Sequence, residues 1–228
     1  MTEFLVGYHI RDRSQEEVGA AIRFARFTPA WVSPCHGPWI SVFPEPAETM
    51  DMEVLNRIGT LLSRTLKTYV WSALLNDSRS LLYTVYEKGE VKAEYDSFPE
   101  LYGSKSRSYR RLTDGKPGLM VDLCPAAVPL ETMEEVLFRK PLAEAVSEVA
   151  LEEKVDCEEE LMSLMPEEYV HERIMEKRGY ATEKIRLAEL ARLLGVSYAL
   201  HTYSELSEKM KKGPSDLAGA DEFMQVNR

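Results

Sequence analysis

A cysteine and a histidine stand side by side in the segment PAWVSPCHGPWISVFPE, as Cys35 and His36. A nucleophilic thiolate needs a histidine beside it in space and a further group that orients the ring. Neighbours on an extended chain point to opposite sides, so these two side chains are not placed to act on each other. The prolines and the glycine favour a tight turn between two strands instead, with Trp31 and Trp39 packing as cross-strand anchors.

The remaining cysteines and histidines do not follow a metal-binding spacing. A zinc site needs three or four ligands at short, regular intervals. Here the other thiols and imidazoles are scattered along the chain at His9, Cys124, Cys157, His171 and His201. The sequence therefore predicts no metal site, no cofactor and no disulfide framework.

A carboxylate followed by a basic loop is the second candidate for chemistry. Tyr95 and Asp96 precede the segment SKSRSYRRLTDGKPG, which contains Arg110 and Arg111. An aspartate can act as a general base while arginines hold an anion, so these four residues form the predicted binding site. The competing interpretation is structural, since Asp96 and Ser97 after a strand are good formers of side-chain-to-backbone turns.

The region around Asp96 also carries a resemblance. A D-S turn, a Tyr-containing strand, a Gly turn and a Tyr-Asp-Ser step follow in order at Asp77, Ser78, Tyr83, Tyr86, Gly89, Tyr95, Asp96, Ser97 and Tyr102. This order resembles a group of uncharacterised bacterial α+β proteins, as does the later LARLLGVS…YSEL. The resemblance covers about a third of the chain and implies no activity.

Two helical stretches suggest other functions. Residues 187–206 resemble a helix-turn-helix, with Gly195 in the turn, but the second helix would present Ser197, Tyr198 and His201 without a Lys or Arg before Lys209. The acidic run around residues 158–160 suggests divalent cations. Consecutive glutamates radiate around a helix, however, so a solvated face is the simpler interpretation.

The hydrophobic pattern predicts the elements that hold these residues. Strands and helices alternate as β-α-β-β-α-β-β-β, with Ser14 as the first helix N-cap. This order predicts an α+β fold, an antiparallel sheet with two helices on one face in a ferredoxin-like arrangement with an extra hairpin. An α-helical C-terminal segment follows. The expected divisions are a sheet domain (1–103), a basic linker loop (104–118), a helical segment (119–212) and a flexible tail (213–228).

Charge is segregated along the chain. The formal net charge is −10, and residues 131–168 alone contain 13 acidic and three basic residues. An acidic chain is unsuited to phosphate-backbone binding, so nucleic acid is an unlikely partner class. No apolar run is long enough to cross a bilayer and the N-terminus lacks a signal-peptide pattern, so we expect a cytoplasmic protein without membrane association.

These patterns favour a non-enzymatic protein-protein interaction or regulatory module. The basic loop and the acidic helices suggest self-association or a protein partner. One alternative is a small-molecule hydrolase or transferase with its site near residues 95–111. The other is a DNA-binding regulator acting through residues 187–206.

Overall fold

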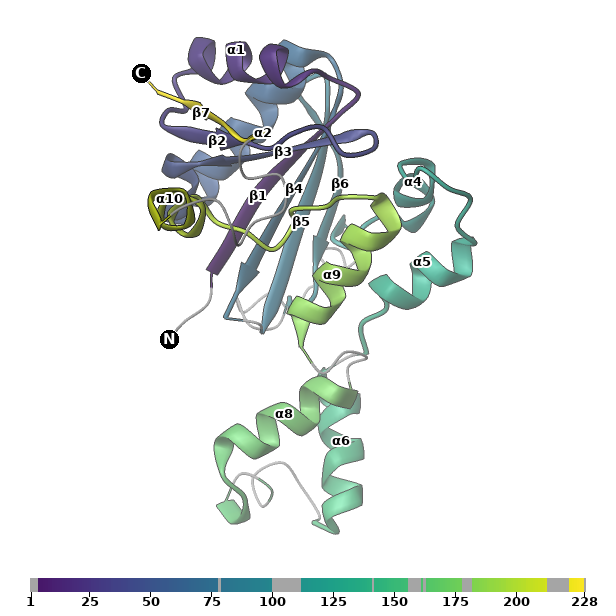
Figure 1. Ribbon diagram of the computed structural model, residues 1–228. Helices are drawn as coiled ribbons and strands as arrows, with labels where there is room; N and C mark the ends of the chain where they lie inside the picture. Colours follow the sequence, from purple (N-terminus) through teal and green to yellow (C-terminus); the bar gives the residue numbers. More distant parts are fainter. Residues whose placement is uncertain are drawn as a thin grey trace.

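The fold is α+β, built on one seven-stranded antiparallel sheet (Figure 1). The computed structural model describes residues 4–77, 79–99, 112–140, 142–155, 161, 163–177, 182–212 and 222–227. The strand order is β6-β5-β4-β1-β3-β2-β7. The strands are β1 (Phe4–Arg11), β2 (Ala30–Val32), β3 (Trp39–Pro44), β4 (Tyr69–Asn76), β5 (Ser80–Glu87), β6 (Glu90–Asp96) and β7 (Met224–Val226).

The first two helices, α1 (Gln15–Ala25) and α2 (Met52–Leu66), pack in one apolar cluster with alternate residues of the sheet. Ser14 is the N-cap of α1, as the sequence predicts, and it also forms a complete capping box with Glu17; Asp51 caps α2. Strand β1 contributes Val6, Tyr8 and Ile10 to this cluster. The period of two places the intervening residues of β1, including His9, on the other face of the sheet. A short 3-10 helix, η1 (Glu45–Thr49), joins β3 to α2.

Strands β4, β5 and β6 form an antiparallel meander. Tyr83 of β5 lies directly opposite Tyr95 of β6, and the register shifts between Val85 and Tyr86. Beyond β6, Asp114 forms an isolated bridge with Tyr95, and helix α4 begins at Pro117. The predicted linker 104–118 is thus part of the folded body from Leu112 onward, because its backbone extends the sheet. Its residues 104–111 lie outside the described residues.

The second face of the sheet is covered by later helices. Helices α4 (Pro117–Asp122), α5 (Leu130–Leu137) and α9 (Glu183–Leu194) share one large cluster with Trp39, Trp71, Tyr83 and Tyr95. Thr182 caps the start of α9, and Gly195 ends it in the left-handed conformation. Much of the C-terminal helical segment therefore completes the core of the sheet.

Helices α6 (Leu142–Glu153) and α8 (Glu167–Lys177) form a hairpin that stands away from the sheet (Figure 1). We call residues 142–177 the arm. The arm has its own apolar cluster, whose central members are Val146, Val149, Val170 and Ile174. In the sequence, the arm lies between α5 and α9, two helices that pack on the sheet. No helix of the described part of the chain is long and apolar enough to cross a membrane.

Part of the segment that the sequence predicts to be a flexible tail, residues 213–228, forms a strand. After α10 (Tyr203–Lys212), residues Met224–Val226 form the edge strand β7, which pairs antiparallel with β2. Val226 is fully buried beneath α1, so the burial of an apolar side chain and a ladder of backbone hydrogen bonds hold this end of the chain. Residues 213–221 lie outside the described residues.

Candidate functional site

Two of the four predicted site residues lie in a buried polar cluster at the end of β6. Tyr95 stacks on Tyr83 with ring centroids 5.1 Å apart and an interplanar angle of 15°. The hydroxyl of Tyr83 donates a 2.7 Å hydrogen bond to the carbonyl of Gly115, where a Cβ atom would collide with that hydroxyl. Burial, with a smaller contribution from Tyr95, raises the pKa of Tyr83 well above its usual value. The phenol is therefore a structural hydrogen-bond donor.

Asp96 forms the predicted turn at this position. One carboxylate oxygen accepts a 2.9 Å hydrogen bond from the N–H of Phe98. The hydroxyl of Ser97 accepts a 2.9 Å hydrogen bond from the N–H of Leu81, so the turn is tied to the neighbouring strand. Asp96 is only 1% exposed. These contacts favour the structural interpretation of the Tyr-Asp-Ser step over the role of a general base, which needs access to a substrate.

Arg139, a cation that no sequence pattern indicated, lies beside Asp96. Arg139 follows α5, donates to the backbone carbonyl of Asp96 and lies 5.7 Å from the ring centroid of Tyr95. It also bonds the Thr113 hydroxyl at 3.3 Å. Arg110 and Arg111, predicted for this place, lie outside the described residues.

A second missed cation, Arg186 of α9, is buried beside Tyr95 with 1% exposure. Its Nε pairs with Glu183 Oε2 at 2.9 Å, and Glu183 is also 1% exposed. Its Nη1 donates to the Tyr95 hydroxyl and to the carbonyls of Val136 and Phe138, at 3.0 and 2.7 Å for the carbonyls. The only sequence signal for this pair is a Glu and an Arg three residues apart in an otherwise leucine-rich helix.

Arg186 joins the two ends of the arm. The carbonyls of Val136 and Phe138 lie at the end of α5, just before the arm begins. Arg186 itself lies on the first turn of α9, just after the arm returns. The tyrosine pair, Arg139 and Arg186 thus form a fixed base from which the arm projects.

The turn containing Cys35 and His36 contacts the segment between α9 and α10. His36 Nε2 and the Tyr198 hydroxyl are 2.9 Å apart in a hydrogen bond. Cys35 is exposed, and its thiol donates to the carbonyl of Gly37 at 3.4 Å. The thiol thus contacts a backbone carbonyl, and the imidazole contacts a phenol. This arrangement matches the expectation that neither residue activates the other.

Both tryptophans near this turn pack as predicted, and each also donates a hydrogen bond across the fold. Trp39 is 2% exposed and its indole N–H donates to the carbonyl of Leu194 at 2.7 Å. Trp31 lies opposite Phe43 and donates to the Ser207 hydroxyl at 2.9 Å. The β2–β3 hairpin is therefore tied to the end of α9 and to α10.

The predicted helix-turn-helix geometry is wrong in its second helix. Helix α9 ends at Leu194 and α10 begins at Tyr203, so Ser197, Tyr198 and His201 precede the second helix. Tyr198 instead packs with Trp31 and Phe43 in a third apolar cluster. The leucines of α9 face the sheet, because Leu187, Leu190 and Leu194 join the main core.

His9 lies at the centre of the second face of the sheet and is fully buried. Its Nδ1 is 2.8 Å from the Ser41 hydroxyl, and its ring centroid is 4.9 Å from that of Trp71. Burial lowers the pKa of His9 to about 3, so the ring is neutral in the folded protein at neutral pH. The described residues hold no group of three His, Cys, Asp or Glu side chains that could bind a metal ion.

The burial of His9 predicts a loss of stability in mild acid. The unfolded chain binds the proton with a pKa near 6.5, so the free energy of unfolding is unaffected above that pH and falls as the pH drops below it. At pH 5 the expected loss from this residue is about 2 kcal/mol relative to pH 7.5. Urea denaturation gives the free energy of unfolding of the wild type and of His9→Gln at both pH values. The wild type should lose about 2 kcal/mol more than the variant between pH 7.5 and pH 5.

Parallel pH profiles for the two proteins would contradict this expectation. If His9→Gln does not fold, NMR of the wild type tests the same prediction. In the wild type, the NMR ring-proton shifts of His9 should not titrate between pH 7.5 and 5, whereas an exposed histidine titrates in that range.

The arm carries most of the net charge of the protein. Residues 142–177 contain 12 acidic and three basic residues, a net charge of −9 out of −10. Two of the three basic side chains connect the two helices, since Arg173 of α8 pairs with Glu152 of α6 at 2.7 Å and Lys177 contacts the same carboxylate. These contacts, led by the one from Lys177, lower the pKa of Glu152. The outer surface is thereby left acidic, with Glu144 and Glu172 exposed.

Comparisons with protein-family models, with curated proteins and with solved structures find no match to this chain.

Proposed function

We propose that this protein is a non-enzymatic interaction module, and that its acidic arm binds a basic protein surface. The observation that carries the proposal is the construction of the arm. Helices α6 and α8 pack chiefly on each other around their own apolar cluster, and they stand away from the sheet (Figure 1). A hairpin that adds nothing to the main core retains a large surface for a partner.

The arm offers apolar contacts within its acidic surface. Leu151 near the end of α6 is 78% exposed and Leu164, just before α8, is 63% exposed. Single exposed leucines are ordinary, but here both occur at the outer end of one short hairpin. Apolar anchors surrounded by charge are typical of a protein interface, where the charges guide association and the apolar groups supply affinity.

A second copy of this chain is the partner that charge complementarity favours. The rest of the chain has a net charge of only −1, and its sequence includes the cationic cluster Lys105, Arg107, Arg110, Arg111 and Lys116. The arm of one copy and the basic loop of another carry opposite charge, so electrostatic attraction favours their contact.

Reversing charge on the arm is expected to weaken self-association. Glu144→Lys together with Glu172→Lys changes two exposed carboxylates on α6 and α8 and should raise the dissociation constant by about tenfold. Sedimentation equilibrium at about 0.01 M salt, where the Debye length is about 30 Å, measures the association. At about 1 M salt, where the Debye length is about 3 Å, the self-association of the wild type should be as weak as that of the variant.

The matched control is Glu94→Lys, an exposed carboxylate on β6 outside the arm. It should leave the association unchanged. Leu151→Ser should weaken association at both salt concentrations, because its contribution does not depend on charge. A wild type that stays monomeric at low salt at high protein concentration would rule out a second copy as the partner.

The two alternative functions receive less support. A hydrolase or transferase using Asp96 requires that carboxylate to reach a substrate, whereas it is buried and engaged in a turn. A DNA-binding role for residues 187–206 requires a second helix that presents Ser197, Tyr198 and His201, whereas these three residues precede α10. We also propose that residues 4–76 follow a ferredoxin-like arrangement. The strand order β4-β1-β3-β2 and the shared cluster of α1 and α2 support this description.

A further inference from the structure

The outer face of α1 and α2 carries the most exposed large apolar side chain among the described residues. This is Phe24 of α1, which is 81% exposed, slightly more than Leu151 of the arm. Phe24 lines an open groove of about 470 Å³ between α1 and the end of α2. Ala20, Ala21 and Leu66 also line the groove, so much of its surface is apolar. An aromatic ring left exposed beside an apolar groove is typical of an interaction surface.

The same face is cationic. Residues 13–27 and 52–67, which we call the helix face, contain six basic and three acidic side chains. The six basic side chains are those of Arg13, Arg23, Arg26, Arg57, Arg64 and Lys67. Within the described part of the chain, none of the six forms an ion pair with a carboxylate. Glu17 lines the groove, but its carboxylate is bound in the capping box of α1. A partner rich in carboxylates would therefore supply counter-charges that these cations lack.

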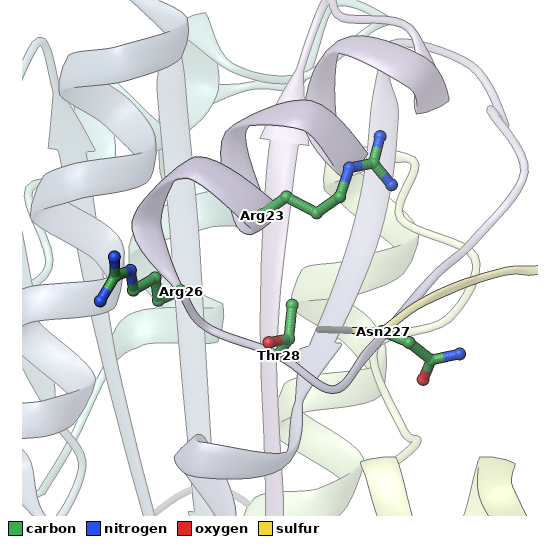
Figure 2. Close-up of a pocket in the computed structure, with 4 residues that line it drawn as sticks. All are labelled: Arg23, Arg26, Thr28 and Asn227. Atoms are coloured by element: carbon green, nitrogen blue, oxygen red, sulfur yellow. The ribbon is translucent and has the colours of Figure 1, made fainter.

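The cations are spread over the helix face and do not converge on one point. Figure 2 shows the guanidinium groups of Arg23 and Arg26 pointing away from each other at the end of α1. At the start of α1, Arg13 donates hydrogen bonds of 2.9 and 2.6 Å to the carbonyl of Leu66, at the end of α2. Lys67 follows there and is exposed. Separated cations around an exposed aromatic ring suit an extended acidic surface better than a small anion.

We propose that the helix face binds the acidic arm of a second copy of this chain. This inference rests on the proposed function of the arm and names the surface that the arm contacts. The arm has a net charge of −9 and the helix face a net charge of +3, so the two surfaces attract each other. Leu151 and Leu164 of the arm are the apolar side chains that would pack in the groove beside Phe24. Because each copy carries both surfaces, a two-fold dimer forms the same contact twice.

Charge reversal on the helix face tests this inference by sedimentation equilibrium. Arg23→Glu together with Lys67→Glu should raise the dissociation constant by about tenfold at about 0.01 M salt, as the reversal on the arm does. Phe24→Ser should weaken association at both low and high salt, because its contribution does not depend on charge. The three side chains are exposed, so circular dichroism should show an unchanged fold.

The matched control is Arg192→Glu together with Lys211→Glu, which changes the net charge by the same amount on α9 and α10. Both side chains are exposed and lie outside the helix face. This variant should associate as the wild type does at about 0.01 M salt. A weakening equal to that of the helix-face reversal would mean that net charge alone controls association, and the inference would be wrong.

A mixture of two weakened variants gives the sharper test. One carries the helix-face reversal, Arg23→Glu with Lys67→Glu, and the other carries the arm reversal, Glu144→Lys with Glu172→Lys. In a heterodimer one contact has its native charges and the other has both charges exchanged, so opposite charges meet at both. The mixture should therefore associate more tightly than either variant alone, with a dissociation constant close to that of the wild type.

The results also separate this inference from the proposed function of the arm. A monomeric wild type, or an arm reversal without effect, overturns both. If the arm reversal weakens association but the helix-face variants do not, the arm keeps its function and the helix face is not its partner. A mixture that associates no more tightly than its components has the same meaning. If Arg110→Glu with Arg111→Glu then weakens association, the receiving surface is the basic loop instead.

Discussion

Replacement of Arg186 by leucine is expected to lower the free energy of unfolding by about 3 to 5 kcal/mol, the usual cost of breaking a buried ion pair from one side. The substitution leaves the carboxylate of Glu183 buried without its cation. It also removes the donor from the carbonyls of Val136 and Phe138 and from the hydroxyl of Tyr95. Urea denaturation measures the loss as a shift of the midpoint at constant slope.

A double-mutant cycle separates the ion pair from the rest of the cluster. Glu183→Leu removes the second charge, so Glu183→Leu together with Arg186→Leu should cost less than the sum of the two single variants. The double variant should still be less stable than the wild type, because the two carbonyls at the end of α5 lose their donor. Additive single effects would contradict a direct interaction between the two side chains.

The cluster around Arg186 also connects stability with the proposed function. Its contacts lie at the base of the arm, while the exposed Leu151 lies near the outer end of α6. Arg186→Leu should therefore change the orientation of the arm as well as the stability of the fold. Loss of association in this variant alone would not identify the interface, which is why the charge reversal at Glu144 and Glu172 is the direct test.

Local signals in the sequence were sufficient to predict most of the individual elements. The cap at Ser14, the helix that starts at Thr182 and ends at Gly195, and the meander from Tyr69 to Asp96 all follow from residues that lie close together in the chain. The same applies to the turn at Asp96 and Ser97, which needs only a short side chain beside its own backbone.

The features that local patterns did not predict depend on contacts between distant segments. Arg186 is buried because it meets β6 and the end of α5, and a count of charges treats such a residue as exposed. The strand at Met224–Val226 is too short to show a period, and it forms because β2 presents a free edge. The position of Arg139 beside Asp96 likewise requires α5 to lie against the sheet, which no spacing in the sequence reveals.

Substitution of Trp39 by alanine is expected to lower the free energy of unfolding by about 3 to 5 kcal/mol, the range for truncation of a buried aromatic side chain. The indole is 2% exposed and belongs to the main core on the second face of the sheet. Its N–H also bonds the carbonyl of Leu194, so the variant leaves a buried acceptor at the end of α9 without its donor. Urea denaturation gives the magnitude.

A comparison of three variants distinguishes packing from hydrogen bonding at this position. Trp39→Phe keeps most of the apolar volume and removes only the donor, so its loss should be about 1 to 3 kcal/mol, the cost of an unsatisfied buried acceptor. Cys35→Ser, four residues away on the exposed turn, should change stability by no more than about 0.5 kcal/mol. If Trp39→Ala were as stable as Cys35→Ser, the Trp39 side chain would not be stabilising the fold, and the prediction would be wrong. We expect Trp39→Ala to be much less stable than Trp39→Phe. That order of stabilities would show that the segment around Cys35 and His36 stabilises the fold mainly through Trp39.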